Sequence, residues 1–321
     1  MKAFFHIGMD KTGTTFLQGF AHEKRAELLK HGICYPLGVW PNDFSHVDFA
    51  RAHGAGWHFE ATELESERAE QLLMGLDPTK ALLVSSEALS VVPNAAFVNR
   101  LKRWTLCYGY DDCKIILYLR NQIDMFVSLY GESIKWGRKE NLDEFYKISR
   151  DRLFFSEMIK SWELYFGAEN LIVMNYDEEK EKLLLSFLRC IGLSEFAEFE
   201  DYQPVFDNVS PPQIVLEYIR RNRLPLGRAQ LYEYITSTFG RRREAKLRDL
   251  AKLAVWRLPE ALIEDIQKFE LDNSLIKNSR FKPFKSLNQV VAEYNAKVMD
   301  LDEEDITRNF LLFSLDLLYQ R

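Results

Sequence analysis

Residues 6–15 read HIGMDKTGTT, and their first two residues end a short apolar run over 2–7 that predicts a β-strand. Apolar residues then recur at helical spacing over 14–29. The ten residues therefore join a strand to a helix through a turn that contains Gly8 and Gly13. An α/β protein binds phosphate at such a place, because the first backbone N–H groups of the helix have no partner within the helix and its dipole favours an anion.

The lysine of this turn, Lys11, lies between its two glycines. The spacing from Gly8 to Gly13 matches a nucleotide-binding P-loop, but Thr14 stands where that loop has its Lys, and Lys11 lies earlier. A nucleoside triphosphatase uses its Lys on the β- and γ-phosphates and a Ser or Thr on Mg²⁺. A 5′-phosphosulfate is shorter and less charged, and needs one cation near its bridging oxygen. We expect Lys11 to supply that cation, and Thr14 and Thr15 to add hydroxyl donors.

Strands and helices alternate over the first 200 residues. Apolar runs at 80–85, 114–119 and 171–174 predict buried strands, and a helix is expected to follow the second of them directly. This order predicts an α/β fold, a parallel β-sheet flanked by helices, with ligands at the C-terminal ends of the strands. Later residues show helical periodicity without a convincing strand. We therefore expect an α/β core over 1–203 and a mainly helical C-terminal extension of the same domain over 204–321.

Residues 36–61 form a connection too long for an ordinary loop, and loops of this length are usually functional or disordered. We expect this one to cover a ligand site. It contains His46, which titrates near neutrality and is a candidate base. Aromatic residues in and beside it would suit stacking against sugar rings: Tyr35, Trp40, Phe44 and Trp57.

Composition limits the classes of function. The net charge of −6 disfavours non-specific nucleic-acid binding, and the apolar runs are too short to span a bilayer. No signal peptide is visible, and the four cysteines lie far apart without a CxxC pair, which suits a reducing compartment. We therefore expect a cytoplasmic protein without a transmembrane segment or a nucleic-acid partner. The sequence does not indicate its oligomeric state.

Two segments resemble the cofactor-binding segments of sulfotransferases, particularly bacterial ones, that depend on 3′-phosphoadenosine 5′-phosphosulfate (PAPS). The loop 8–15 looks like the family's 5′-phosphosulfate loop. Residues 114–130, KIILYLRNQIDMFVSLY, resemble its 3′-phosphate segment, a strand ending in Arg with a Ser eight residues later. Arg120 and Ser128 occupy those positions, and a guanidinium suits phosphate. Gln122 stands where the family commonly has Pro, which is only a favoured residue at a helix start.

The resemblance implies a P-loop-like sulfotransferase fold and an enzyme that transfers a sulfuryl group from PAPS to an acceptor hydroxyl. The product nucleotide would be adenosine 3′,5′-bisphosphate. The long loop 36–61 is expected to cover the acceptor site, and its aromatic residues make a saccharide or glycolipid the expected acceptor. The residues expected to bind the cofactor are Gly8, Lys11, Thr12, Gly13, Thr14, Thr15, Arg120 and Ser128.

In-line sulfuryl transfer needs a base on the acceptor hydroxyl and cations on the leaving oxygen. Glu87 is the first candidate base, because it follows a core strand and would face the same crevice as Lys11. His46 is the second. Glu87 could instead cap the following segment or pair with an arginine.

A metal site is not expected. His46, Asp48, His53 and His58 form a cluster in the sequence, but their spacing matches no helix-borne pair of metal ligands.

Two other classes of function stay open. A P-loop kinase or nucleotide hydrolase would hold Mg²⁺ through an Asp at the end of an apolar strand, and among the predicted strand ends only Asp177 fits. No Lys follows Gly13 to complete such a site. A non-catalytic nucleotide-binding protein would keep the fold without turnover, and the presence of Lys11 and Glu87 argues against it.

Overall fold

The computed structural model describes residues 1–37, 44–53, 79–90, 95–195, 199, 202, 211–222, 230, 254–302 and 304–308. The chain forms two compact units. The first unit contains Met1–Asn121, Phe154–Pro204 and Leu271–Phe284, and the second contains Gln122–Leu153, Val205–Glu270 and Lys285–Arg321. The expected boundary between residues 203 and 204 lies outside the described residues.

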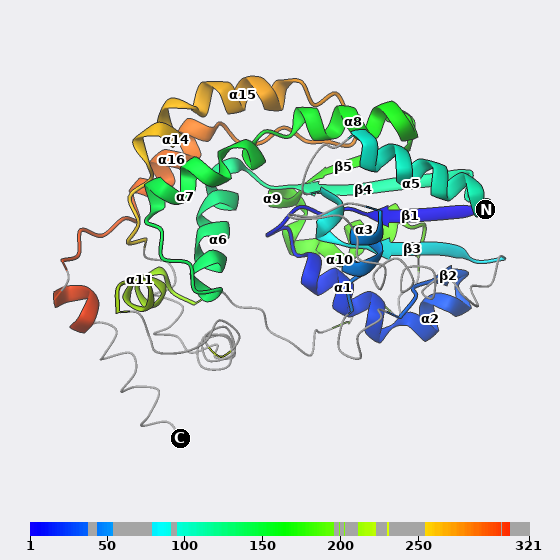
Figure 1. Ribbon diagram of the computed structural model, residues 1–321, viewed down its shortest axis with the longest axis horizontal. Coiled ribbons are helices and arrows are strands. Elements are labelled where there is room, and N and C mark those ends of the chain that lie inside the picture. Colours follow the sequence, from blue (N-terminus) through cyan, green and yellow to red (C-terminus); the bar gives the residue numbers. More distant parts are fainter. Residues whose placement is uncertain are drawn as a thin grey trace. The chain divides into compact units, whose positions relative to one another are not determined.

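A parallel sheet forms the centre of the first unit (Figure 1). Its described strands are β1 (Lys2–His6), β2 (Ile33–Cys34), β3 (Ala81–Ser85), β4 (Asp112–Leu119) and β5 (Leu171–Asn175). Their order across the sheet is β2-β3-β1-β4-β5, and every neighbouring pair is parallel. Parallel strands covered on both faces read as continuous apolar runs, which is why the sequence pattern marks them. The predicted α/β fold is confirmed.

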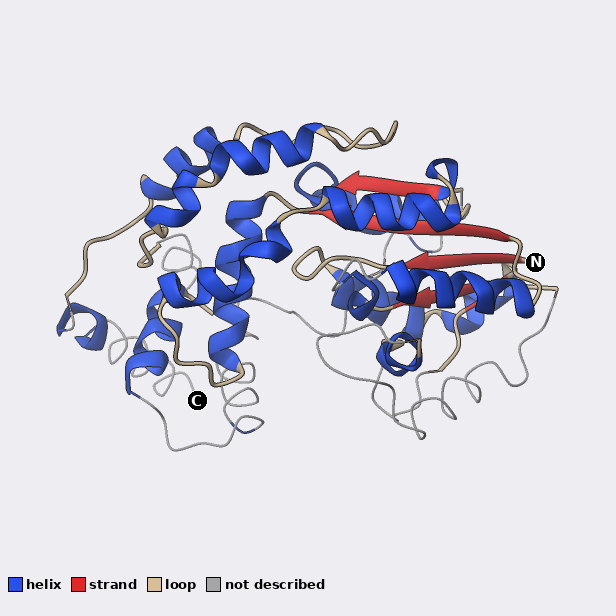
Figure 2. Ribbon diagram, turned by 45° about the horizontal axis from the view of Figure 1, so that its top comes forward, coloured by secondary structure: helices blue, strands red, loops and turns tan. Residues whose placement is uncertain are grey.

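Helices cover both faces of the sheet (Figure 2). They are α1 (Thr14–Glu23), α2 (Arg25–Lys30), α3 (Val47–Ala52), α5 (Ala95–Cys107), α8 (Ser156–Phe166), α9 (Tyr176–Glu179) and α10 (Leu183–Cys190). Phe4 belongs to the core formed with α1, α2 and α10. Its neighbour Phe5 points to the opposite face, where its ring lies 6.4 Å from Phe49 of α3 and 6.3 Å from Phe166 of α8.

A segment from far along the chain covers the edge of this sheet. Asn278 lies in the part of the first unit contributed by Leu271–Phe284. Its side-chain oxygen accepts from the Val173 N–H at 3.4 Å, and its side-chain nitrogen donates to the Leu171 carbonyl at 2.7 Å. The amide thus replaces the strand that β5 lacks on this side, and the edge is not left open to other chains.

The described part of the second unit is helical, apart from an isolated parallel bridge between Ala254 and Val298. Its helices are α6 (Gln122–Lys135), α7 (Leu142–Ser149), α11 (Gln213–Asn222), α14 (Glu260–Glu264) and α16 (Leu287–Asn295), and α15 (Ile266–Ser274) begins in it. The α6 helix is the one predicted to follow the second apolar strand. None of the described helices is long and apolar enough to cross a membrane.

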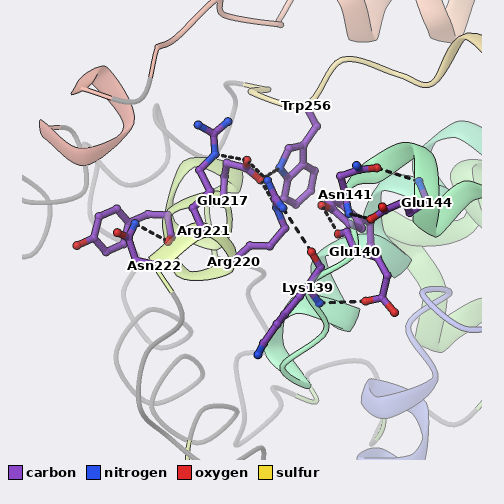
Figure 3. Close-up of polar contacts among 11 residues, drawn as sticks. Lys139, Glu140, Asn141, Glu144, Glu217, Arg220, Arg221, Asn222 and Trp256 are labelled. Carbon is purple, nitrogen blue, oxygen red and sulfur yellow. Dashed lines mark hydrogen bonds and ion pairs between the residues drawn. The ribbon is translucent and has the colours of Figure 1, made fainter.

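One carboxylate of the second unit is buried and surrounded by donors (Figure 3). Glu217 is only 4% exposed, and it accepts hydrogen bonds from Arg220 at 2.6 and 2.9 Å, from Arg221 at 2.6 Å and from the Trp256 indole at 3.0 Å. Arg220 also donates to the Lys139 carbonyl at 3.4 Å. Burial alone would raise the pKa of Glu217, but these donors outweigh it and lower the pKa below its ordinary value. The carboxylate therefore joins α11 to Trp256, and Arg220 joins α11 to the α6–α7 turn.

We expect Glu217→Gln to lower the free energy of unfolding by about 3–5 kcal/mol, because it removes the buried charge that pairs with the half-buried Arg220 and with Arg221. The new amide nitrogen would also face donors rather than acceptors. Denaturant unfolding followed by circular dichroism measures the change. Glu264→Gln, the same substitution at an exposed position of the second unit, is the matched control and should stay within about 0.5 kcal/mol. Equal stability of the two variants would contradict the prediction.

Candidate active site

The loop Gly8–Thr15, called the phosphate loop from here on, leads from the end of β1 into α1. Gly13 is the N-cap residue of α1 and no side chain caps the helix, so its first N–H groups are not engaged by a capping side chain. Gly13 has φ 75° and Lys11 has φ 65°, both in the left-handed region. Such a conformation is strained for Lys and persists only where its surroundings hold it, which is common at ligand sites.

Three side chains hold the phosphate loop in this shape. Thr12 is buried and its hydroxyl donates to the Met9 carbonyl at 2.6 Å. The Ser90 hydroxyl lies 3.3 Å from the Gly8 carbonyl. Arg120 donates to the Lys11 carbonyl at 3.3 Å. Thr12 thus uses its hydroxyl hydrogen within the loop.

Both glycines of the loop are required by close packing. A Cβ atom on Gly8 would lie 2.5 Å from Cγ2 of Thr14 and 2.7 Å from Nε2 of His6. A Cβ atom on Gly13 would lie 2.4 Å from a methyl group of Leu183. The loop backbone therefore approaches its neighbours more closely than any larger residue allows.

His6 lies beneath the loop and is fully buried. Its Nδ1 lies 2.7 Å from the Ser85 hydroxyl, while its Nε2 has no hydrogen-bond partner among the described residues. Burial lowers the pKa of His6 to about 3, so the ring is neutral at physiological pH. Among the described residues, Lys11 of the loop and Arg120 beside it carry positive charge that His6 does not supply.

Glu87 lies at the same edge of the sheet as the phosphate loop. His6 of β1 and Ser85 of β3 are register partners, and the Ser86 N–H donates to the His6 carbonyl at 3.0 Å. Glu87 follows as the first residue of a short 3₁₀ helix and is half-buried. The Ser90 hydroxyl, which lies near Gly8, also lies 2.9 Å from the Glu87 carbonyl. Neighbouring strand ends thus bring the candidate base close to the loop.

Arg120 brings the two sequence motifs together, although it lies 109 residues after Lys11. It follows β4 directly, and its Nε lies 3.9 Å from the Asp177 carboxylate. Its guanidinium lies 5.6 Å from the centre of the Tyr176 ring. Asp177 also accepts two hydrogen bonds from Asn121, one from its backbone and one from its side chain, each at 3.0 Å. Sequence reasoning assigned no role to Tyr176, and it considered Asp177 only as a magnesium ligand.

His46, the second candidate base, has a backbone partner on each ring nitrogen. The side chain is 1% exposed, and its Nδ1 accepts a hydrogen bond from the Ser85 N–H at 2.9 Å. The proton of the neutral ring therefore lies on Nε2, which donates to the Pro36 carbonyl at 3.0 Å. Both ring nitrogens are engaged by backbone groups, so neither can take a proton from an acceptor while these bonds persist. Tyr35, expected at the acceptor site, is also buried, and its hydroxyl donates to the Phe44 carbonyl.

Several other predictions cannot be placed at this site. Ser128 is half-buried on α6 of the second unit, and its assignment to the 3′-phosphate stays a prediction. His58, Trp40 and Trp57 lie outside the described residues, as do 38–43 and 54–61 of the expected acceptor loop. Within the described residues no group of three or more His, Cys, Asp or Glu could hold a metal ion.

Solved structures similar to this chain include two sulfotransferases and a retinol dehydratase. No protein-family model matches the chain, and no curated protein sequence matches it significantly. A sulfotransferase from Alicyclobacillus acidocaldarius is 17% identical, with a TM-score of 0.44, over 77% of this chain and 99% of that one. Retinol dehydratase in complex with androsterone and inactive cofactor PAP is 14% identical, with a TM-score of 0.39, over 87% and 81%. The sulfotransferase domain from the curacin biosynthetic pathway is 12% identical, with a TM-score of 0.39, over 80% and 98%.

Proposed function

We propose that this chain is a sulfotransferase that transfers a sulfuryl group from PAPS to an acceptor hydroxyl. The observation that carries the proposal is the hydrogen bond from Arg120 to the Lys11 carbonyl, which puts a guanidinium beside the phosphate loop. PAPS has two anionic groups on its ribose, a 5′-phosphosulfate and a 3′-phosphate. A lysine in the loop and an arginine beside it match that distribution of charge.

The phosphate loop suits the 5′ end of this cofactor. The N-terminus of α1 has no side-chain cap, and the left-handed residues Lys11 and Gly13 turn the backbone in front of it. Thr14 and Thr15 begin the helix and add hydroxyl groups. Gly8 and Gly13 have no side chain, and neighbouring side chains leave no room for a Cβ atom at either position. Arg120, which lies beside the loop, is proposed to bind the 3′-phosphate.

Bound PAPS would supply the sulfuryl group for an in-line displacement. In this proposal Lys11 offsets the negative charge that develops on the leaving oxygen. Glu87 accepts the proton of the acceptor hydroxyl, because the ring nitrogens of His46 are occupied by backbone partners. The phosphate loop and Arg120 would hold the product nucleotide, adenosine 3′,5′-bisphosphate (PAP), until its release.

A saccharide or glycolipid is the proposed acceptor. The proposal rests on the aromatic residues Trp40 and Trp57 in the sequence between Pro36 and Ala61, whose rings would stack on a sugar. An array of saccharides, glycolipids, phenols and steroids incubated with sulfur-labelled PAPS tests it. Transfer to phenols or steroids alone would exclude this acceptor class.

The contacts of Asp177 argue against a magnesium-dependent kinase or hydrolase. Its carboxylate accepts both hydrogen bonds from Asn121 and faces Arg120, so a metal ion would have to displace these groups. The phosphate loop also lacks the Lys that would follow Gly13. These two features favour a metal-independent transfer over phosphoryl chemistry.

The chain is expected to bind PAP far more tightly than AMP, because AMP lacks the 3′-phosphate that Arg120 would contact. A hydrogen bond to a charged group contributes on the order of 1.5–3 kcal/mol, which is roughly a 10- to 150-fold difference in Kd. Isothermal titration calorimetry with PAP, AMP and ATP, with and without Mg²⁺, measures it. Equal affinity for PAP and AMP, or ATP binding that depends on Mg²⁺, would contradict the proposal. PAP binding without turnover on a broad acceptor array would indicate a non-catalytic protein.

A further inference from the structure

We propose that Asp177 is a positioning residue of the cofactor site, which aims Arg120 and, through it, supports the phosphate loop. This inference rests on the proposed function, because the ligand that Arg120 would bind is the 3′-phosphate of PAPS. Asp177 itself is not proposed to touch the cofactor. Its carboxylate acts on the side chain and on the backbone around Arg120.

The backbone around Asp177 is fixed from two directions. Asn175 ends β5, where it is the register partner of Leu119 in β4, the residue before Arg120. The Asn175 side chain accepts from the Asp177 N–H at 3.0 Å and donates to the Lys282 carbonyl at 3.0 Å. The carboxylate of Asp177 is therefore held beside the end of β4.

The carboxylate then fixes the chain on the far side of Arg120. One oxygen of Asp177 accepts from both the backbone and the side-chain nitrogen of Asn121, the next residue. Arg120 thus lies between Leu119 of β4, which is paired to β5, and Asn121, whose N–H donates to Asp177. The backbone of Arg120 therefore has little freedom to move. Only the torsion angles of its side chain remain to be restricted.

The second carboxylate oxygen acts on those torsions. Arg120 Nε is buried without a hydrogen-bond acceptor among the described residues, and the Asp177 oxygen lies 3.9 Å away. At this distance the pair is an ion pair and not a hydrogen bond. Nη1 donates to the Lys11 carbonyl, and the guanidinium lies near the Tyr176 ring. The guanidinium orientation is therefore restricted by three partners: the Asp177 carboxylate, the Lys11 carbonyl and the Tyr176 ring.

Holding the guanidinium in advance should improve phosphate binding. A free arginine side chain loses considerable rotamer entropy when it binds, and preorganisation removes part of that cost. The same contacts stabilise the left-handed conformation of Lys11, because Arg120 bonds its carbonyl. Loss of the Asp177 charge should therefore weaken PAP binding through Arg120.

A double-mutant cycle in PAP binding tests this role. Asp177→Asn keeps the size and an acceptor for Asn121 but removes the charge, and it is expected to raise the Kd for PAP roughly three- to tenfold. In the Arg120→Ala background the same substitution is expected to change the Kd less than about twofold. Glu178→Gln removes a charge from the exposed neighbour on the same helix and should leave PAP binding unchanged.

The melting temperature of each variant separates positioning from folding. If Asp177→Asn does not fold, Asp177→Glu is measured in its place and is expected to keep PAP binding that depends on Arg120. An effect of Asp177→Asn that is equally large without Arg120, or PAP binding as tight as in the native chain, overturns the inference. If the native chain itself does not prefer PAP to AMP, the proposed function fails instead, so the two failures are distinguishable.

Discussion

Lys11→Ala is expected to abolish sulfuryl transfer while leaving the fold intact. The substitution removes the only lysine of the phosphate loop, and with it the cation proposed to offset charge on the leaving oxygen. Loss of one preorganised electrostatic group typically costs 10²–10³-fold in kcat, roughly 3–4 kcal/mol. Lys11 is half-buried and lies outside the hydrophobic core, and Ala tolerates φ 65° no worse than Lys, so the loop backbone should not change.

The measurement is transfer from sulfur-labelled PAPS to the acceptor found on the array, with circular dichroism and thermal unfolding as tests of the fold. Lys30→Ala, the same substitution at an exposed residue of α2, is the matched control and should keep full activity. A folded Lys11→Ala protein with near-native turnover would show that the loop does not use this cation.

The sequence predicted the sheet well, because its signal is local. The run at 114–119 forms the C-terminal part of β4, where residues 115–119 are completely buried. Because helices cover both faces of such a strand, nearly every residue in it is apolar. The strand therefore appears in the sequence as a continuous apolar run, without alternating polar residues. The strand, loop and helix around Gly8–Thr15 were predictable for the same reason, with glycines between two periodic segments.

Contacts between distant segments could not be predicted. The amide of Asn278 completes the edge of β5 from a position more than 100 residues later, and no periodicity marks that pairing. His46 is a similar case, since its sequence context suggests an exposed loop histidine. Its ring instead binds the backbone at the end of β3, a role set by tertiary structure alone. The contact of Asp177 with Arg120 also depends on which strands lie side by side.

Glu87→Gln is expected to lower the rate of transfer by roughly 10²–10⁴-fold while cofactor affinity changes little. The substitution preserves the shape of the side chain and removes its ability to accept a proton. Because Glu87 lies two residues after the end of β3 and the cofactor is proposed to bind at the phosphate loop and Arg120, PAP binding should stay within about twofold. Initial rates with saturating PAPS and calorimetry with PAP measure the two quantities separately.

His46→Ala provides the comparison that distinguishes the two candidate bases. It removes the acceptor of the Ser85 N–H and the donor to the Pro36 carbonyl, and a buried group left unsatisfied costs about 1–3 kcal/mol. We therefore expect His46→Ala to lower the melting temperature, but to reduce the rate of the folded protein much less than Glu87→Gln does. The reverse ranking, a nearly inactive but stable His46→Ala and a nearly normal Glu87→Gln, would mean that the histidine leaves its backbone partners during turnover. Glu87 would then have a structural role, and His46 would accept the proton of the acceptor hydroxyl.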